Sequence, residues 1–199
     1  MDTEAGVILL AAGASTRLGQ TKQLVKHQGV ALVRRTACLA LAVTPCCVVV
    51  TGAAMNRVGR ALSGLPLIHA HNPDWRTGMA GSLATGIRSL PPQTDSALVL
   101  LCDQWHLNEK DLVQLMTAWR NNPGHISAAS WKDGFGPPVM FPRSLFPQLL
   151  GLKGDRGARS IIRKNAGSVN FVPIPHAADD LDSPADLLQM HRYGETAGN

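Results

Sequence analysis

Residues 6–22 read GVILLAAGASTRLGQTK. The first seven form a short apolar run that begins with glycine, which is typical of a strand buried on both faces. The rest are small residues with two glycines six positions apart and two cations, Arg17 and Lys22. Small residues let backbone N–H groups approach an anion closely, and Arg and Lys side chains bind phosphate oxygens. The stretch therefore predicts a phosphate-binding loop at the carboxyl end of a first strand, where open α/β sheets bind ligands.

The spacing excludes two common phosphate loops. A Walker loop needs G-x-x-x-x-G-K-[ST], whereas here five residues separate Gly13 from Gly19, and Gln20 follows. The dinucleotide motif G-x-G-x-x-G is also absent, because Ala14 and Ser15 follow Gly13. An alternative is a small-residue turn between a strand and a helix, with two unrelated surface cations. The residue pattern by itself does not decide between this turn and a phosphate loop.

The remainder of the chain alternates between apolar runs and segments with helical spacing. We expect strands near residues 46–52, 67–71, 97–102, 126–130, 139–141 and 169–174, and helices near 32–43, 53–62, 83–90, 108–119, 143–150, 156–165 and from 184. Strands that alternate with helices predict a three-layer α/β/α arrangement with a mostly parallel, Rossmann-like sheet. A length of 199 residues and the lack of a linker predict a single domain over residues 1–199.

Composition limits the classes of partner. Apolar residues make up 45% of the chain, and the net charge is +5. Residues 1–101 hold nine Lys and Arg against four Asp and Glu, which suits a polyanionic small molecule, whereas the lack of basic runs argues against nucleic acid. Four cysteines without C-x-x-C spacing indicate buried free thiols. The acidic start and the lack of a long apolar run predict a cytoplasmic protein with no signal peptide or membrane span.

The phosphate-loop stretch resembles the signature of the MobA/MocA-type nucleotidyltransferases. The matching positions are Leu10-Ala11-Ala12-Gly13-x-Ser15-x-Arg17-x-Gly19-x-x-Lys22. This resemblance implies the fold of the nucleotide-diphospho-sugar transferases and a loop that wraps the triphosphate of an NTP. It assigns nucleotide binding to Leu10, Ala11, Ala12, Gly13, Ser15, Arg17 and Lys22. Arg17 and Lys22 would also act in catalysis by offsetting the charge of the triphosphate.

Two acidic positions are candidate metal ligands. Asp103 directly follows the strand expected over residues 97–102, where a carboxylate suits Mg²⁺ but could also cap a turn or helix. Cys102-Asp103-Gln104 resembles the C-D-Q-P motif of the family, whose Asp binds the metal; here Trp105 replaces the proline. Asp182 lies before the last expected helix, where acids also favour the helix dipole. The resemblance to the family's D-x-D-x-P-x-D-L segment implies that Asp182 completes the Mg²⁺ site beside the catalytic Asp103.

Residues 72–83, NPDWRTGMAGSL, form a third distinctive stretch. Small residues at a helix start leave free N–H groups that could face a ligand, although the stretch could equally be an ordinary entry to a helix. It matches the family's N-P-x-W-x-x-G-M-x-x-S-L segment. The resemblance marks Asn72, Gly78 and Ser82 for nucleotide contact.

Two segments resemble the acceptor side of the family. Gly136 and Pro137 lie in a G-x-P-x-x-F segment, and Arg156 and Arg159 lie in a G-D-x-G-A-R segment. Two arginines can hold a phosphate between them, although either could be a helix-surface residue. The resemblance implies that residues 1–104 bind the NTP and that residues 105–199 bind the acceptor, a pterin cofactor that carries a phosphate.

The resemblance is strongest to the cytidylyltransferase branch of the family. It implies transfer of CMP from CTP to the terminal phosphate of the molybdenum cofactor, with release of pyrophosphate and formation of molybdopterin cytosine dinucleotide. Ala12 stands where the guanylyl branch has glycine, and its methyl group should favour the smaller base. We expect a Mg²⁺-dependent monomer whose product serves an apo molybdenum hydroxylase. The alternatives are a nucleotidyltransferase that uses GTP or another phosphorylated acceptor, and a non-catalytic carrier or insertion chaperone for the cofactor.

Overall fold

The computed structural model describes residues 5–155 and 157–196. The strands are β1 (Ala5–Ala11), β2 (Lys26–His27), β3 (Val30–Ala31), β4 (Cys47–Thr51), β5 (Ile68–His71), β6 (Ser96–Leu101), β7 (Ile126–Trp131), β8 (Gly134–Pro142) and β9 (Val169–Pro173). The α-helices are α1 (Leu32–Val43), α2 (Met55–Ala61), α3 (Met79–Ser89), α4 (Glu109–Asn121), α5 (Phe146–Leu150), α6 (Arg159–Lys164) and α7 (Pro184–Thr196).

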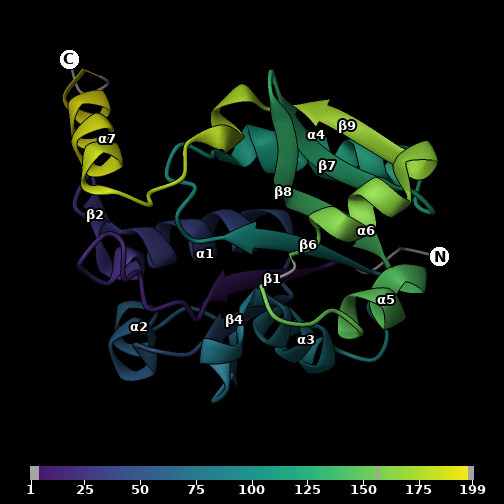
Figure 1. Cartoon of the computed structure of the whole chain (residues 1–199), viewed down its shortest axis with the longest axis horizontal. Helices are drawn as coiled ribbons and strands as arrows, with labels where there is room; N and C mark the ends of the chain where they lie inside the picture. The colour runs from purple at the N-terminus through teal and green to yellow at the C-terminus, as the bar shows by residue number, and fades with distance from the viewer. Residues whose placement is uncertain (1–4, 156, 197–199) are drawn as a thin grey trace.

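Within the described residues, seven strands form one sheet in the order β5-β4-β1-β6-β8-β7-β9 (Figure 1). All neighbouring pairs are parallel except those made by β8, which runs antiparallel to both β6 and β7. The mostly parallel sheet predicted from the sequence is therefore confirmed. The chain continues from β1 to β4 on one side and returns to β6 on the other, so the strand order reverses between β1 and β6. Ligands of open α/β sheets bind at such a reversal.

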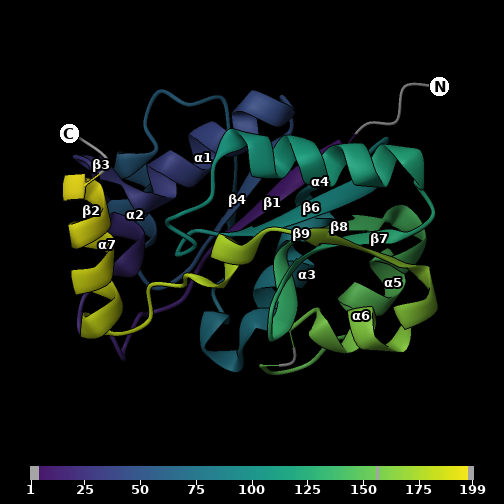
Figure 2. The ribbon, with the colours of Figure 1, turned by 90° about the horizontal axis from the view of Figure 1, so that it is seen from above.

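Alternate side chains of β1 pack into two different hydrophobic cores, one on each face of the sheet. Val7 and Leu9 belong to the core under α1, α2 and α4, whereas Ile8 and Leu10 belong to the core over α3, α5 and α6. All four side chains are buried, because the strand lies in the middle of the sheet and is covered on both faces. Figure 2 shows α1 and α4 on one side of the sheet and α3, α5 and α6 on the other. This is the three-layer α/β/α arrangement that the sequence predicted.

Helix α3 packs very close to the central strand. A Cβ atom added at Gly86 would lie 2.4 Å from Cγ2 of Ile8, so no side chain larger than glycine's fits at this position. The close packing fixes the first turn of α3 near the carboxyl end of β1, beside the predicted phosphate loop.

Helix α4 begins at a capping box formed by Asn108 and Asp111. The Asn108 side chain accepts hydrogen bonds from the N–H groups of Lys110 and Asp111, and the Asp111 carboxylate accepts one from the N–H of Asn108. The cap fixes where the segment after β6 ends, and Asp103 lies in that segment.

The hairpin β2–β3 and helix α7 form a unit outside the sheet (Figure 1). The sequence did not predict this hairpin, because each strand is only two residues long; Gln28 and Gly29 turn the chain with positive φ angles of 51° and 81°. Trp105 packs beneath this unit in a small hydrophobic cluster that includes Leu181 and Met190, and it is only 2% exposed. The tryptophan that replaces the family's proline therefore connects the Asp103 segment to α7.

The helices in the described part of the chain include none that is both long and apolar enough to span a membrane.

Candidate active site

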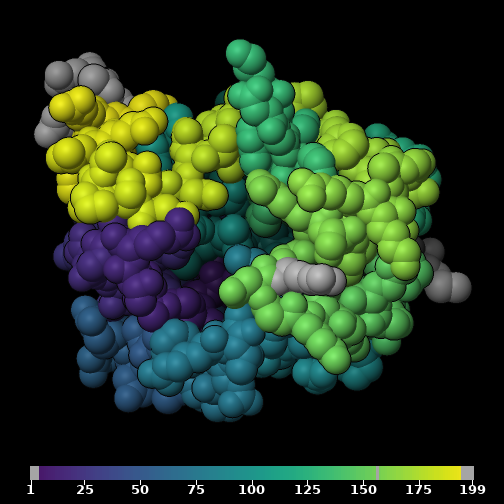
Figure 3. All heavy atoms as spheres, in the orientation of Figure 1, coloured from purple at the N-terminus to yellow at the C-terminus, as the bar shows by residue number. Residues whose placement is uncertain are grey.

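An open cleft of about 550 Å³ lies at the carboxyl ends of β1 and β6, where the strand order reverses. Figure 3 shows it as a hollow between the N-terminal segment, in purple, and the green segment near residue 150. The residues lining it are Leu10–Arg17 and Lys22, Gln23, Trp75, Arg76, Gly78, Met79, Ser82, Leu101, Cys102, Asp103 and Asp155. The cleft thus brings together the phosphate loop, the segment after β6 and the start of α3, which are far apart in the sequence.

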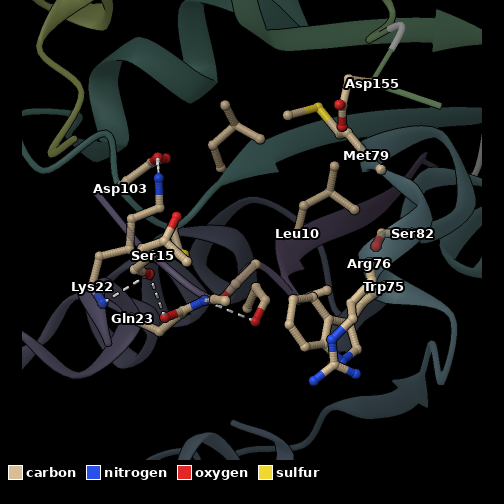
Figure 4. A pocket seen from close by; sticks show the side chains of 18 of the residues that line it. Leu10, Ser15, Lys22, Gln23, Trp75, Arg76, Met79, Ser82, Asp103 and Asp155 are labelled. Atoms are coloured by element: carbon tan, nitrogen blue, oxygen red, sulfur yellow. Dashed lines mark hydrogen bonds and ion pairs between the residues drawn. The ribbon is translucent and has the colours of Figure 1, made fainter. Parts of the chain in front are cut away.

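A network of hydrogen bonds fixes the loop between β1 and Lys22. Ser15 has a positive φ of 57°, and its hydroxyl oxygen accepts a hydrogen bond from the N–H of Lys22 at 3.1 Å. The Gln23 amide donates to the carbonyl oxygens of Ala11 and Gly13. Figure 4 shows Ser15, Lys22 and Gln23 on one side of the cleft and Trp75, Arg76 and Ser82 on the other.

Lys22 joins the loop to both predicted metal ligands. Its ammonium group contacts Asp103 Oδ2, and its distance to Asp182 Oδ1 is 3.2 Å. Arg17 reaches the other oxygen of Asp182 at 3.1 Å. Burial opposes the charge of Lys22, but Asp103 and Asp182 outweigh burial and raise its pKa above the ordinary value. All four of the predicted catalytic and metal-binding residues therefore belong to one charge cluster with Lys22 at its centre.

The two carboxylates fit a divalent cation. Asp103 Oδ1 is buried and has no hydrogen-bond partner in the described part of the chain, which leaves one oxygen available to a ligand. Mg²⁺ prefers one or two carboxylates together with phosphate oxygens and water. The described residues hold no group of three or more His, Cys, Asp or Glu suited to a metal. Asp103 and Asp182 would therefore hold the cation together with phosphate oxygens of a bound nucleotide.

A third carboxylate lies close to this pair. Shielding from water and the charges of Asp103 and Asp182 raise the pKa of Asp180 to about 7. The backbone also keeps these segments together, because the N–H of Leu181 donates to the carbonyl oxygen of Asp103 at 3.0 Å.

The start of α3 differs in part from the expectation. Gly78 and Ser82 line the cleft, whereas Asn72 is buried outside its lining and donates from its side-chain amide to the Ser82 hydroxyl at 3.0 Å. The predicted free N–H groups are not all free, because the N–H of Ala80 donates to the carbonyl oxygen of Gly154 at 3.1 Å. This contact was missed because residue 154 is far from α3 in the sequence.

Of the predicted acceptor residues, the three that the structure describes lie outside the cleft lining. Gly136 and Pro137 belong to β8, and the Pro137 carbonyl oxygen accepts a hydrogen bond from Gln104 at 2.7 Å. The Arg159 side chain donates to the carbonyl oxygen of Phe135 at 3.0 Å. Arg156, the other predicted arginine, lies outside the described residues.

Sequence reasoning missed several residues of the cleft. Gln23 directly follows Lys22 but carries no motif of its own, and Asp155 comes from a segment that was assigned to the acceptor. Trp75 and Arg76 lie inside the recognised 72–83 stretch, and the Arg76 guanidinium stacks 4.4 Å from the centre of the Trp75 ring. Cys102 also lines the cleft, but burial raises its pKa and keeps the thiol uncharged.

A loop of small residues with two cations, at the reversal of a mostly parallel sheet and facing two carboxylates, is the arrangement expected of a nucleotide-binding enzyme. Comparison with family models matches residues 7–169 to the MobA-like NTP transferase domain. The chain belongs to this family.

The chain is also similar to a curated protein and to several solved structures. The purine catabolism protein PucB of Bacillus subtilis (strain 168) is 28% identical over 198 residues, which cover 93% of this chain and 95% of that protein. The crystal structure of Rv0371c from Mycobacterium tuberculosis H37Rv has a TM-score of 0.84 at 23% identity, over 96% of this chain and 100% of that one. Rv0371c has also been solved in complex with manganese, with a TM-score of 0.78 at 21% identity over the same shares of the two chains.

A further solved structure has a similar fold. The structure of a nucleotidyl transferase from Methanothermobacter thermautotroptrophicus has a TM-score of 0.84 at 20% identity, over 98% of this chain and 99% of that one. At these identities, the structural likenesses show a common fold.

Proposed function

We propose that this protein transfers CMP from CTP to the terminal phosphate of the molybdenum cofactor, forming molybdopterin cytosine dinucleotide and pyrophosphate. The observation that carries the proposal is the position of Lys22. Its ammonium group closes the phosphate loop and contacts both Asp103 and Asp182. A triphosphate in the loop would therefore lie beside a cation and two candidate metal ligands.

The residues of the cleft would work by alignment and charge neutralisation. A phosphate monoester is already anionic near pH 7, so its oxygen can attack the α-phosphorus of CTP without a general base. Lys22 and Arg17 would stabilise the charge that grows on the leaving pyrophosphate. Asp103 and Asp182 would hold Mg²⁺, which would supply positive charge that neutralises part of the charge of the triphosphate. The related protein solved with manganese supports a divalent cation.

Ala12 supports the choice of CTP. It lines the cleft at the end of β1 and is only 5% exposed, so its methyl group takes up space that a glycine would leave open. A single methyl group discriminates between ligands by about 1–3 kcal/mol. We propose that this difference favours a pyrimidine over a purine.

The acceptor would enter from the side of residues 105–199. Gly136, Pro137 and Arg159 lie on β8 and α6, and Asp155 reaches the cleft from the preceding segment. We propose these elements, together with Arg156, as the acceptor site of a single domain in which residues 1–104 hold the nucleotide. The purine catabolism role in the name of PucB is compatible with delivery of the product to an apo molybdenum hydroxylase that oxidises purines.

Pyrophosphate release with each of the four NTPs, with and without molybdenum cofactor, tests the proposal. We expect release that requires cofactor and a divalent cation and is fastest with CTP. A preference for GTP, or release of pyrophosphate with a different phosphorylated acceptor, would contradict the proposed substrates. Cofactor binding without pyrophosphate release would indicate a carrier instead.

A further inference from the structure

We propose that Gln23 is a positioning residue that holds the phosphate loop in its triphosphate-binding shape. The inference rests on the proposed function, since it assumes that the cleft receives an NTP. Gln23 lies in the short 3-10 helix Lys22–Leu24 and is only 1% exposed.

The side chain of Gln23 uses its full set of polar groups on the loop. Its amide nitrogen donates to the carbonyl oxygen of Gly13 at 2.7 Å and to that of Ala11 at 3.2 Å, and its amide oxygen accepts from the Ser15 hydroxyl at 3.3 Å. A glutamine amide offers two donors and an acceptor, so one side chain ties together three points of the loop.

These hydrogen bonds determine which backbone groups of the loop can face an anion. A carbonyl oxygen that faced a triphosphate would repel it, and Gln23 holds two of them on its own amide. In a trans peptide, the N–H of the next residue points opposite to the carbonyl. Fixing the carbonyl of Gly13 therefore also fixes the direction of the N–H of Ala14, which lines the cleft.

The same network supports a strained residue and the catalytic lysine. Ser15 keeps a positive φ of 57°, a conformation that a non-glycine residue retains only where its surroundings hold it. Its hydroxyl donates to Gln23 and accepts from the N–H of Lys22. Loss of Gln23 would release Ser15, and through it the backbone from which the Lys22 ammonium reaches Asp103.

The test compares how tightly CTP and CMP bind to wild-type protein and to Gln23→Leu, measured by calorimetry with Mg²⁺ present. We expect the affinity for CTP to fall about tenfold and that for CMP to fall less than twofold, because the loop contacts the β- and γ-phosphates that CMP lacks. Thr36→Val is the matched control: it removes a buried hydrogen bond from a side chain to a backbone carbonyl in α1, away from the cleft. It should leave the ratio of the two affinities unchanged.

Gln23→Glu provides a second variant of nearly the same shape, which can still accept from Ser15. At neutral pH its carboxylate cannot donate to Gly13, so the loss of CTP affinity should match or exceed that of Gln23→Leu. This loss of CTP affinity should become smaller as the pH falls, because the introduced carboxyl then regains a proton that it can donate. An equal loss of affinity for CTP and CMP in both variants, or a wild-type ratio in either, would overturn the inference. Failure of wild-type protein to bind any NTP would instead overturn the proposed function.

Discussion

Lys22 contacts two carboxylates, and those carboxylates are the candidate ligands of a divalent cation. At the scale of single residues, the proposed function would make the lysine a competitor of the metal as well as a ligand of the triphosphate. An ammonium and a cation that share the same two carboxylates repel each other strongly in a partly buried site. The position of Lys22 should therefore change when metal and nucleotide bind together.

Replacing Lys22 with Met tests this double role. We expect kcat/KM for the nucleotide to fall about 100-fold, because a charge that stabilises the leaving group is lost. The affinity for Mn²⁺ without nucleotide should rise, because the competing ammonium is gone. Pyrophosphate release and Mn²⁺ titration followed by electron paramagnetic resonance measure the two effects. Lys26→Met, at an exposed lysine nearby, should change neither. Unchanged nucleotide kinetics in Lys22→Met would contradict the role.

Asp103→Asn removes the charge of the buried candidate ligand and keeps its shape. We expect turnover to fall about 100-fold or more, since second-shell changes alone already cost 10–100-fold. The melting temperature should fall only moderately, because the amide occupies the same space and Lys22 keeps its contact with Asp182, although the Lys22–Asp103 ion pair is lost. Asp95→Asn, at an exposed position before β6, is the control. Full activity of Asp103→Asn at ordinary Mg²⁺ concentration would exclude a role for Asp103 as a metal ligand.

At the scale of elements, the start of α3 is joined to the segment between α5 and α6. Gly78 has a φ of 112°, and a Cβ atom there would lie 2.4 Å from the carbonyl carbon of Gly154. These two segments of the chain pass so closely that only glycine fits at position 78. This contact joins the nucleotide side of the cleft to the segment that carries Asp155.

Gly78→Ala should therefore be destabilising. Strain and the clash together should cost about 2 kcal/mol or more, which lowers the melting temperature of a chain of this size by at least about 4 °C. Gly59→Ala is the matched control, because it lies in α2 with nothing within 4 Å of the added atom, and it should be neutral or slightly stabilising. Thermal unfolding of both variants decides the matter, and equal melting temperatures would contradict the close approach.

His27, in the hairpin β2–β3, should make the stability of the fold depend on pH. Burial of His27, together with the charges of Arg35, His106 and His191, lowers its pKa from the ordinary value of 6.5. The unfolded chain then binds more protons than the folded one as the pH falls below 6.5. The contribution of His27 to stability is therefore full above pH 6.5 and is lost as the pH falls toward its lowered pKa.

His27→Gln should flatten this dependence. We expect the free energy of unfolding, measured with urea from pH 7 to pH 5, to fall less steeply than in the wild type. His71→Gln replaces an exposed histidine on β5 and should leave the slope unchanged. Parallel slopes for the wild type and His27→Gln would exclude the buried histidine as the cause.

Elements with strong local patterns could be predicted from the sequence, whereas contacts between distant turns could not. The apolar run of β1, the cap at Asn108 and the acid after β6 each depend on neighbouring residues. By contrast, Gln23 acquires its role only because the chain returns under Gly13, and Gly154 meets α3 only in three dimensions. Trp105 is similar, since its partners lie in α7 and near β2.

At the scale of the whole molecule, the sheet brings two sets of residues to one edge. The first strands provide the phosphate loop, and β6 provides Asp103 on the other side of the reversal. The later strands add β8, which carries the candidate acceptor residues, and the chain then returns through Asp182 to the first loop. In the proposed function, this arrangement would place a nucleotide between the phosphate loop and an incoming acceptor.

In the proposed reaction, the acceptor attacks the α-phosphorus of CTP in this cleft. The most direct measurement follows the label from [α-³²P]CTP and from [γ-³²P]CTP in separate reactions with molybdenum cofactor and Mg²⁺. We expect the α label in the cofactor product and the γ label in pyrophosphate, in equal amounts. A γ label in the cofactor, or pyrophosphate without a labelled product, would contradict nucleotidyl transfer.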